Sequence, residues 1–320
     1  MRKSIKCAVV GVGYLGKFHA DKYAVLPNAE LVAVCDSDAE RSREIAAKYN
    51  VLALSDYRDL VGKVDAVSIV ATTSMHYEVA KFFLEHKIHV LIEKPITTSV
   101  ATAEELQKIA KKNKLVVQVG HLERFNPAFT ALKKHLSKPI FIEAVRLAPF
   151  KLRCTDVSVI LDLMIHDIDL ILNIITAPIK NIYAYGAPVL SDKIDMATAN
   201  IEFANGCIAN IKASRVSMQT KRKIQVFQSD SCLTCDLNDK TITVYGKGQS
   251  KIKPYMPEIT SERISLETND ALYTEIAAFV NAIIKHTPPP VTAAEATKAL
   301  QVALEIEDIA TKHLLKLEAN

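Results

Sequence analysis

A glycine-rich turn near the start of the chain has the spacing of a phosphate-binding site. The run GVGYLG places Gly11, Gly13 and Gly16 after an apolar strand candidate and before a helix that begins near Tyr14. The first glycine permits a tight turn, the second lets the backbone approach a pyrophosphate, and the third allows the helix to pack closely. Free N–H groups at the start of that helix favour an anion. The pattern predicts dinucleotide binding by these glycines together with Tyr14 and Leu15.

A carboxylate after the second strand candidate gives this turn a specific context, because glycine-rich turns also occur as simple joints between a strand and a helix. Asp36 lies twenty residues beyond Gly16, where it can accept hydrogen bonds from the adenosine ribose hydroxyls. The same charge repels a 2′-phosphate, which favours NAD over NADP. Asp36 and Ser37 are therefore predicted to bind the cofactor. The alternative is that Asp36 only starts the next turn.

A lysine at the end of another strand candidate is a candidate for acting on a substrate. Glu93, Lys94 and Pro95 follow the apolar segment 89–92, and open α/β sheets bind ligands at the carboxyl ends of their strands. The ammonium group of Lys94 can hold a substrate hydroxyl or lower the pKa of a neighbouring acid. Taken alone, Lys94 is more simply interpreted as a surface lysine after a strand.

Polar residues form one stripe on an otherwise apolar helix that is expected at residues 159–175. At about 100° per residue, Asp162, His166, Asp169 and Asn173 fall on one side, and leucines and isoleucines cover the other directions. Histidine titrates near neutrality, and a carboxylate one turn away can orient it and raise its pKa. This arrangement suits removal of an alcohol proton during hydride transfer. The alternative is an ordinary solvated helix face.

The elements needed to position these residues alternate between strands and helices in the first part of the chain. Continuous Val, Ile and Leu runs between amphipathic segments indicate a parallel sheet covered on both faces. A Rossmann domain with a doubly wound parallel sheet is therefore predicted for residues 1–121. Strands are expected at 5–10, 31–36, 52–54, 66–72, 89–93 and 115–120, and helices at 39–49, 75–86 and 100–113.

The rhythm changes after Pro127, where an α+β domain with a large, open, mostly antiparallel sheet is expected. Asn205-Gly206 between two alternating segments is a strong hairpin signal, and residues 237–240 look like another turn. Residues 122–320 are predicted to form one domain for substrate binding and oligomerisation. Its strands are expected at 139–147, 182–185, 197–203, 207–213, 223–227, 231–236 and 241–245, and its other helices at 127–136, 270–285 and 293–315.

The composition is that of a globular protein and argues against several classes. The 40 basic and 36 acidic residues leave a net charge of +4, too small and dispersed an excess for nucleic-acid binding. The apolar stretch 157–179 contains acidic residues that make membrane insertion costly, and the first residues lack the pattern of a secretory signal, so a cytoplasmic protein is expected. Cys232 and Cys235 lie in a strand-like segment and are interpreted as incidental, with no metal predicted.

Together these motifs resemble the glucose-fructose oxidoreductase, inositol dehydrogenase and MocA family. The resemblance rests on GVGYLG with the later Asp36, ATTSMHYEVA, EKP, the Asp-x-x-x-His-x-x-Asp helix, and the closing segments DALYTEIAAFVNAI and PPVTAAEATKALQVALEI. It implies a Rossmann domain, an open antiparallel sheet domain, and tightly held NAD or NADP, with NAD favoured here. It further implies a Lys-Pro bond that is often cis and a homodimer or homotetramer.

The resemblance also implies an activity and roles for particular residues. The activity is transfer of hydride to NAD from a ring carbon that carries a hydroxyl group, in a sugar or nucleotide sugar. Lys94 and His166 would flank the reacting carbon, with Asp162 beside them. The residues implied to lie near the cofactor are Thr72, Thr73, His76 and Glu93.

Other details narrow the resemblance. Many members have a glycine two residues before the histidine, whereas this chain has Met164, so a different pocket floor is expected. GHLERFNPAF and DVSVILDLMIHDIDL are most similar to the branch that oxidises the 3-hydroxyl of UDP-N-acetylglucosamine. That similarity implies sugar or diphosphate contacts by Arg124, Asn126 and Arg153, since guanidinium groups bind phosphate oxygens well. Structural caps or ion pairs are the alternative for each of them.

Two other functions are consistent with the same motifs. One is a regulator or scaffold that keeps the dinucleotide-binding fold without chemistry, because fold does not imply function. The presence of both Lys94 and His166 argues against it. The other is a reductase of an imine or tetrapyrrole that consumes NAD(P)H.

Overall fold

The computed structural model describes residues 4–151, 157–253, 256–267 and 269–318, and it divides into two compact units. The first unit comprises residues 1–122 and 270–300, and the second comprises 123–269 and 301–320. The break after residue 122 lies one residue from the predicted boundary. The prediction that all of 122–320 belongs to the second domain is wrong for residues 270–300, which return to the first unit.

The first unit is built on a parallel sheet of six strands in the order β3-β2-β1-β4-β5-β6. Its central strands are buried almost throughout, as their continuous apolar sequences require when helices cover both faces. The strands are β1 (Ile5–Val10), β2 (Ala29–Cys35), β3 (Leu52–Leu54), β4 (Ala66–Ile69), β5 (His89–Glu93) and β6 (Val117–Gly120).

Most helices of the first unit begin at a residue whose side chain caps them. Asp38, Ser99 and Asp270 each accept hydrogen bonds from backbone N–H groups in the first turn of the helix that follows. No side-chain cap is present at the start of α1 or α3 among the described residues. The helices are α1 (Gly16–Val25), α2 (Ala39–Tyr49), the 3₁₀ turn η1 (Tyr57–Leu60), α3 (Thr73–Glu85), α4 (Val100–Asn113), α7 (Ala271–Lys285) and the first part of α8 (Ala293–Glu318).

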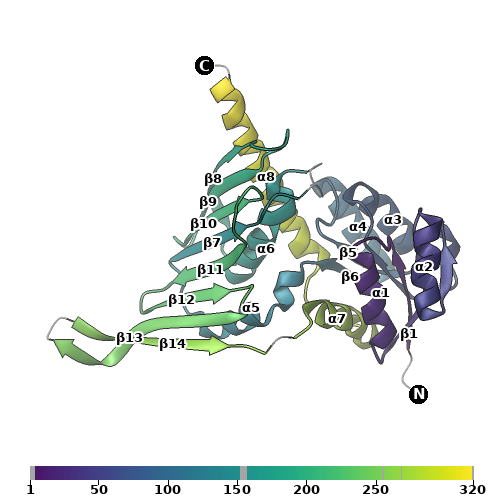
Figure 1. Ribbon diagram of the computed structural model, residues 1–320, viewed down its shortest axis with the longest axis horizontal. Coiled ribbons are helices and arrows are strands. Elements are labelled where there is room, and N and C mark those ends of the chain that lie inside the picture. Colours follow the sequence, from purple (N-terminus) through teal and green to yellow (C-terminus); the bar gives the residue numbers. More distant parts are fainter. Residues whose placement is uncertain (1–3, 152–156, 254–255, 268, 319–320) are drawn as a thin grey trace. The chain divides into compact units, whose positions relative to one another are not determined.

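Packing of α7 explains why the chain returns to the first unit. One face of α7 carries Ile276, Phe279 and Val280, which are completely or almost completely buried in the same core as Val9 of β1 and Tyr23 of α1. In Figure 1, α7 lies beside α1. Removing these large apolar side chains from water stabilises the arrangement by roughly 1.5–3 kcal/mol each. The apolar periodicity of α7 predicted a helix, but it carried no information on which sheet the helix covers.

The second unit is an eight-stranded, mostly antiparallel sheet in the order β14-β13-β12-β11-β7-β10-β9-β8, in which only the β7–β10 pairing is parallel. The predicted hairpin at Asn205-Gly206 is confirmed, and Gly206 has a φ of 86°. The strands are β7 (Phe141–Leu147), β8 (Ile179–Ala187), β9 (Met196–Phe203), β10 (Ile208–Ser214), β11 (Lys221–Phe227), β12 (Ser231–Asp236), β13 (Thr241–Lys253) and β14 (Met256–Ser265).

The strand β14 has no counterpart among the predicted elements. It pairs with β13, and the two long strands form one edge of the sheet, as Figure 1 shows. Its described side chains from residue 258 onward are mostly exposed, because an edge strand needs no continuous apolar face. The sequence of β14 therefore lacks the alternation on which strand prediction depends.

One face of this sheet is covered and the other is open. Ala144, Ile211 and Ile224 lie in one cross-strand row and are completely buried. The helical segments packed on the sheet are η4 (Ile160–Met164) and α6 (Ile165–Ile174), with α5 (Pro127–Leu132) near β12 and β13. The remaining elements of the unit are the 3₁₀ turns η2 (Leu122–Phe125) and η3 (Lys133–His135) and the rest of α8.

The open face carries an apolar row that includes Phe227 and Tyr245, which are partly exposed. Cys232 belongs to this row, whereas Cys235 is buried on the covered face. Two cysteines on opposite faces of one strand cannot bind the same metal ion. The predicted homo-oligomer, for which an exposed sheet face is a suitable surface, stays a prediction.

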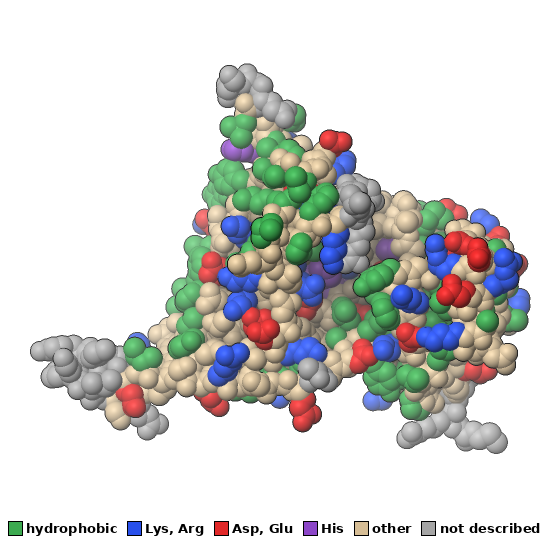
Figure 2. Space-filling view, viewed as in Figure 1, with side chains coloured by type: hydrophobic (Ala, Val, Ile, Leu, Met, Phe, Trp, Pro, Cys, Tyr) green, Lys and Arg blue, Asp and Glu red, His purple; other side chains and the backbone are tan. Residues whose placement is uncertain are grey.

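Within the described ranges, no helix is both long enough and apolar enough to cross a bilayer. On the face drawn in Figure 2, Lys and Arg side chains are intermixed with Asp and Glu side chains.

Candidate functional site

The glycine turn after β1 has a conformation that only glycine meets well. Gly11 has a φ of 86°, and a Cβ there would lie 2.7 Å from the carbonyl oxygen of Val70. A Cβ on Gly16 would collide with the carbonyl oxygen of Gly11. These two glycines therefore permit the turn and the close approach of α1 to it, as the sequence predicted.

Gly13 differs from its two neighbours in the motif. A Cβ on Gly13 would meet nothing within 4 Å, so the protein itself does not require glycine there. Open space above the backbone at the start of a helix without a side-chain cap fits a bound pyrophosphate. The predicted cofactor residues Tyr14 and Leu15 belong to the same turn, immediately before α1.

The carboxylate of Asp36 fixes the glycine turn from the end of β2. Its Oδ2 accepts a hydrogen bond from the N–H of Val12 at 2.8 Å, and its Oδ1 accepts one from the N–H of Asp38 at 3.0 Å. Arg41 lies 3.4 Å from Oδ1. Asp36 thus stands beside the turn at the expected place, while Arg41 adds a positive charge that the sequence analysis did not anticipate.

A cavity of about 650 Å³ opens between these segments at the carboxyl ends of the strands. Another cavity, of about 630 Å³, lies at the opposite ends of the strands, where open α/β sheets rarely bind ligands. Thr72 lines the cavity of about 650 Å³, and Thr73, the first residue of α3, follows it directly. The lining of the first cavity includes Gly11, Gly13, Asp36, Ser37, Arg41 and Thr72.

His76 connects the segments that follow β4 and β5. Its ring nitrogens lie 2.9 Å from the carbonyl oxygen of Pro95 and 3.0 Å from that of Ala71. Burial lowers the pKa of the His76 imidazole, although these two carbonyl groups act in the opposite direction. The predicted location near the cofactor is consistent with its neighbour Ala71, which lines the cavity, but the hydrogen bonds of the ring to these two carbonyl groups are structural.

The Glu93-Lys94-Pro95 segment is held by Glu93. The Lys94–Pro95 peptide bond is cis, as the resemblance implied. One oxygen of Glu93 lies 3.2 Å from Nε2 of His19 on α1, and the other accepts a hydrogen bond from the N–H of Lys94 at 3.2 Å. Gly120 on β6 leaves room for this carboxylate, since a Cβ there would lie 2.7 Å from it. The Glu93 carboxylate therefore supports the backbone of Lys94.

The second unit holds Asp162 and His166, but not on the regular helix that was predicted. Residues Ile160–Met164 form a π-helical turn, η4, and the α-helix α6 begins only at Ile165. π-Turns have wider i→i+5 geometry and often occur at functional sites. Asp162 in η4 and His166 in α6 are both partly exposed, and Met164 between them is completely buried.

The rest of the predicted polar stripe is used for internal contacts. Asp169 is buried and forms a bidentate ion pair with Arg124, with N–O distances of 2.6 and 2.8 Å. Asn173 accepts a hydrogen bond from Lys133 at 2.8 Å. The stripe is therefore not one continuous wall of an open pocket, because its second half is paired with neighbouring elements.

The residues expected to contact the sugar or diphosphate have structural contacts here. Besides the Arg124 ion pair, Asn126 caps α5 by accepting a hydrogen bond from the N–H of Ala128, and its amide donates to the carbonyl of Leu237. These contacts agree with the alternative stated for both residues. Arg153 lies outside the described residues. Substrate contacts by the three stay predictions.

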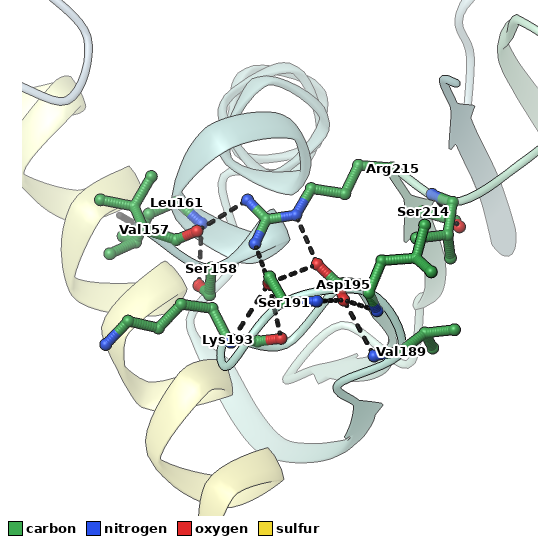
Figure 3. A network of polar contacts seen from close by, with 11 residues as sticks. Val157, Ser158, Leu161, Val189, Ser191, Lys193, Asp195, Ser214 and Arg215 are labelled. Carbon is green, nitrogen blue, oxygen red and sulfur yellow. Dashed lines mark hydrogen bonds and ion pairs between the residues drawn. The ribbon is translucent and has the colours of Figure 1, made fainter. Parts of the chain in front are cut away.

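A buried network fixes the beginning of the η4 segment (Figure 3). The guanidinium of Arg215 donates to Asp195 Oδ1 at 2.7 Å, to the Ser191 hydroxyl at 3.0 Å, and to the carbonyl of Val157 at 2.7 Å. The other oxygen of Asp195 accepts three consecutive backbone N–H groups of the 189–191 loop. Although burial opposes it, these hydrogen bonds and Arg215 hold the pKa of Asp195 well below its usual range.

Sequence reasoning missed several residues that shape the site. His19, Gly120 and Arg215 had no motif to mark them, because each acts through a contact with a residue far away in the chain. The sequence offered only a histidine in a helix, a glycine inside a strand candidate and an arginine after a strand candidate as signals, and none of these is specific.

The strand order, the glycine turn and the carboxylate after β2 define the first unit as a dinucleotide-binding Rossmann domain. Comparison with family models agrees: residues 5–121 match the oxidoreductase family with an NAD-binding Rossmann fold, and residues 151–249 match the GFO/IDH/MocA C-terminal domain. The chain belongs to the Gfo/Idh/MocA family of oxidoreductases. The predictions of family, fold class, NAD as cofactor and an oxidoreductase activity are confirmed.

Similar proteins cover nearly the whole chain. UDP-N-acetylglucosamine 3-dehydrogenase from Acidithiobacillus ferrooxidans is 39% identical over 94% of this chain and 96% of its own length. Its solved structure, called GnnA, matches with a TM-score of 0.90 over 96% of this chain and 97% of that chain, at 38% identity. Myo-inositol 2-dehydrogenase from Thermotoga maritima is 26% identical over 98% of this chain and 99% of its own length.

A more distant structure shares the fold alone. Levoglucosan dehydrogenase in complex with NADH and levoglucosan has a TM-score of 0.85 and 15% identity, covering 97% of this chain and 98% of that chain.

Proposed function

We propose that this protein oxidises the 3-hydroxyl group of UDP-N-acetylglucosamine to a ketone, with NAD as the electron acceptor. The observation that carries the proposal is the 39% identity over 94% of the chain with the Acidithiobacillus enzyme named for that reaction. This identity extends through both units, whereas a shared cofactor alone would require similarity only in the first. The identity with the inositol dehydrogenase is lower, at 26%.

The cofactor is proposed to bind along the cavity of the first unit. The backbone at Gly13 and the start of α1 suit the pyrophosphate, and Asp36 and Ser37 suit the adenosine ribose. NAD, when bound, takes up a hydrogen with its electron pair from the substrate carbon. Thr72, Thr73 and the Glu93-Lys94 segment are proposed to complete the cofactor site.

Three residues are proposed to act on the hydroxyl group. Lys94 donates a hydrogen bond to the oxygen and stabilises the negative charge that develops there. His166 accepts the hydroxyl proton as general base, and Asp162 favours the protonated form of the imidazole. The oxygen thus loses its proton while the carbon loses hydride, and the carbon–oxygen bond becomes a carbonyl.

An assay with four substrates tests the proposal. The purified protein is incubated with NAD and UDP-N-acetylglucosamine, UDP-glucose, free N-acetylglucosamine or myo-inositol, and formation of NADH is followed by its absorbance. The proposal requires that kcat/KM is highest for UDP-N-acetylglucosamine. A higher value for inositol would refute the substrate, and NADH formation with none of a wide panel of sugars would favour a regulator. Consumption of NADPH with an imine alone would favour the reductase.

A further inference from the structure

The interior of the first unit contains a carboxyl group that the mechanism above does not use. Glu275 on α7 is completely buried, and neither of its carboxyl oxygens has a hydrogen-bond partner among the residues that the structure describes. A charged carboxylate in such a place carries a large desolvation cost. The carboxyl group of Glu275 is therefore expected to be protonated, and hence neutral, in the folded protein.

Glu275 and the residues that support Lys94 form one layer of the interior. This layer comprises Gln118, Gly120, Glu93, His19 and Glu275. The side-chain amide of Gln118 on β6 donates to the main-chain carbonyl of Glu275 at 2.9 Å. Gln118 and Gly120 point to the same face of β6 because they are two residues apart, and the carboxylate of Glu93 occupies the space above Gly120. His19 of α1 contacts Glu93 at 3.2 Å, and α7 packs against β5, whose last residue is Glu93.

The two carboxyl groups differ in their partners, and this difference decides which one is charged. Glu93 is mostly buried, with 12% of its side chain exposed. This burial raises its pKa, but His19 and Lys94 outweigh it and leave the pKa below its usual value. Burial raises the pKa of Glu275 well above its usual range, and the charge of Glu93 raises it further. Two carboxyl groups that repel each other in a poorly hydrated interior cannot both ionise at little cost. Glu93 is the charged member and Glu275 the protonated one.

We propose that Glu275 is a positioning residue for Lys94. As a neutral acid it leaves Glu93 as the one charged carboxylate among the described residues of this layer, so that Glu93 stays on His19 and on the N–H of Lys94. This proposal rests on the proposed function, in which Lys94 acts on the substrate oxygen. Ionisation of Glu275 places a second negative charge in the layer, repels Glu93 and releases the Lys94 backbone.

Other titratable groups near this layer also have to be considered. His19 and Tyr23 are on α1 and Cys7 is on β1, and burial raises the pKa of both Tyr23 and Cys7. Tyr23 and Cys7 therefore keep their protons over the range in which the test is made. Ionisation of Glu275 is therefore the event that adds charge to the layer as the pH rises.

The first experiment compares kcat for the wild type and Glu275→Gln across alkaline pH, with NAD and UDP-N-acetylglucosamine. Glutamine is a neutral isostere of the protonated acid, so we expect equal kcat near neutrality. Above the pKa of Glu275 the wild type should lose kcat by up to about tenfold per pH unit, and the variant should not. Glu104→Gln, an exposed change on α4, is the matched control and should follow the wild type. A single alkaline limb shared by all three proteins would overturn the proposal.

Two further measurements do not depend on activity. Infrared difference spectra of wild type and Glu275→Gln should show a protonated carboxyl band at neutral pH that the variant lacks. Hydrogen exchange at the Lys94 amide, corrected for the intrinsic pH dependence, should accelerate at alkaline pH in the wild type and stay constant in Glu275→Gln. Absence of the band, or equal exchange in both proteins, would refute the positioning role. If these results hold while UDP-N-acetylglucosamine is not oxidised, only the proposed function fails.

Discussion

Apart from Asp36, which Arg41 contacts at 3.4 Å, the buried or mostly buried carboxyl groups of the first unit have different partners from those of the second unit. In the second unit Asp167, Asp169 and Asp195 each have an arginine as partner, at N–O distances of 2.6 to 2.9 Å. In the first unit Glu275 has no partner among the described side chains, and Glu93 has a histidine and a backbone N–H. An arginine stays charged at every accessible pH. A histidine loses its charge as the pH rises, and a protonated carboxyl group loses its proton.

This difference separates structural from adjustable charges. A carboxylate paired with arginine stays fixed, which suits the task of holding η4 and α6 on their sheet. A carboxyl group that depends on a proton responds to its surroundings, which suits a position next to a reacting lysine. The comparison yields four predictions, of which the first concerns the fixed charges.

Loss of Arg146 should have the largest effect. Arg146 is buried and pairs with Asp167 and Glu123, so Arg146→Met leaves the buried carboxylate of Asp167 without its cation and leaves Glu123 with the more distant Arg222. We expect the free energy of unfolding of the second unit to fall by about 3–5 kcal/mol, measured by urea denaturation. Arg222→Gln is the control, because Arg222 is largely exposed and contacts the same Glu123 at 3.5 Å. Its effect should be below about 1 kcal/mol, and equal losses would refute the distinction.

Loss of the proposed catalytic groups should affect turnover and not folding. Lys94→Ala and His166→Ala should each lower kcat by roughly 10²-fold, and neither should change the thermal melting temperature as Arg146→Met does. Steady-state kinetics with UDP-N-acetylglucosamine, together with melting curves, make the comparison. Wild-type kcat in either variant would remove that residue from the mechanism.

Much of the first unit was predictable from the sequence because its signals are local. The segments 5–10, 52–54 and 89–93 were predicted as strands and 39–49 and 100–113 as helices, with the bounds that the structure has. Asp38 and Ser99 cap these two helices, and Asn50 and Lys114 end them in the left-handed conformation. The glycine turn and Asp36 were found for the same reason.

The rest depends on contacts between residues that are far apart in the chain. The sequence placed Asp169 on an open polar stripe, but Arg124, 45 residues away, withdraws it into an ion pair. The π-turn at Ile160–Met164 and the return of α7 to the first unit follow from packing that periodicity does not encode. The edge strand β14 was not predicted because its described side chains are mostly exposed, so its sequence does not alternate between apolar and polar residues.

The pH dependence of stability sharpens the comparison. Since the pKa of Glu275 is raised in the folded state, the unfolded chain ionises first, and stability is lost as the pH rises from about 4.5 toward the folded pKa. The loss is at most about 1.4 kcal/mol per pH unit. Glu275→Gln should lose less stability over this interval in denaturation experiments. The same slope in both proteins would mean that Glu275 is ionised in the folded protein.

Removal of the Asp36 charge should have the smallest effect of the four. Asp36→Ser removes the carboxylate that repels a 2′-phosphate, while Arg41 remains beside it. We expect the ratio of NAD to NADP affinity to fall by about tenfold, or 1.4 kcal/mol, measured by competition binding. Ser55→Ala, another change in the cavity lining, should leave the ratio unchanged. Unaltered selectivity in Asp36→Ser would exclude Asp36 as the determinant.

Isotope transfer tests the central claim most directly. UDP-N-acetylglucosamine with deuterium at C3 is incubated with the protein and NAD, and both products are analysed by mass spectrometry. The account predicts that the reduced cofactor carries the deuterium and that the sugar nucleotide becomes a 3-ketone without it. Reduced cofactor without deuterium, or a sugar that keeps it, would contradict oxidation at C3.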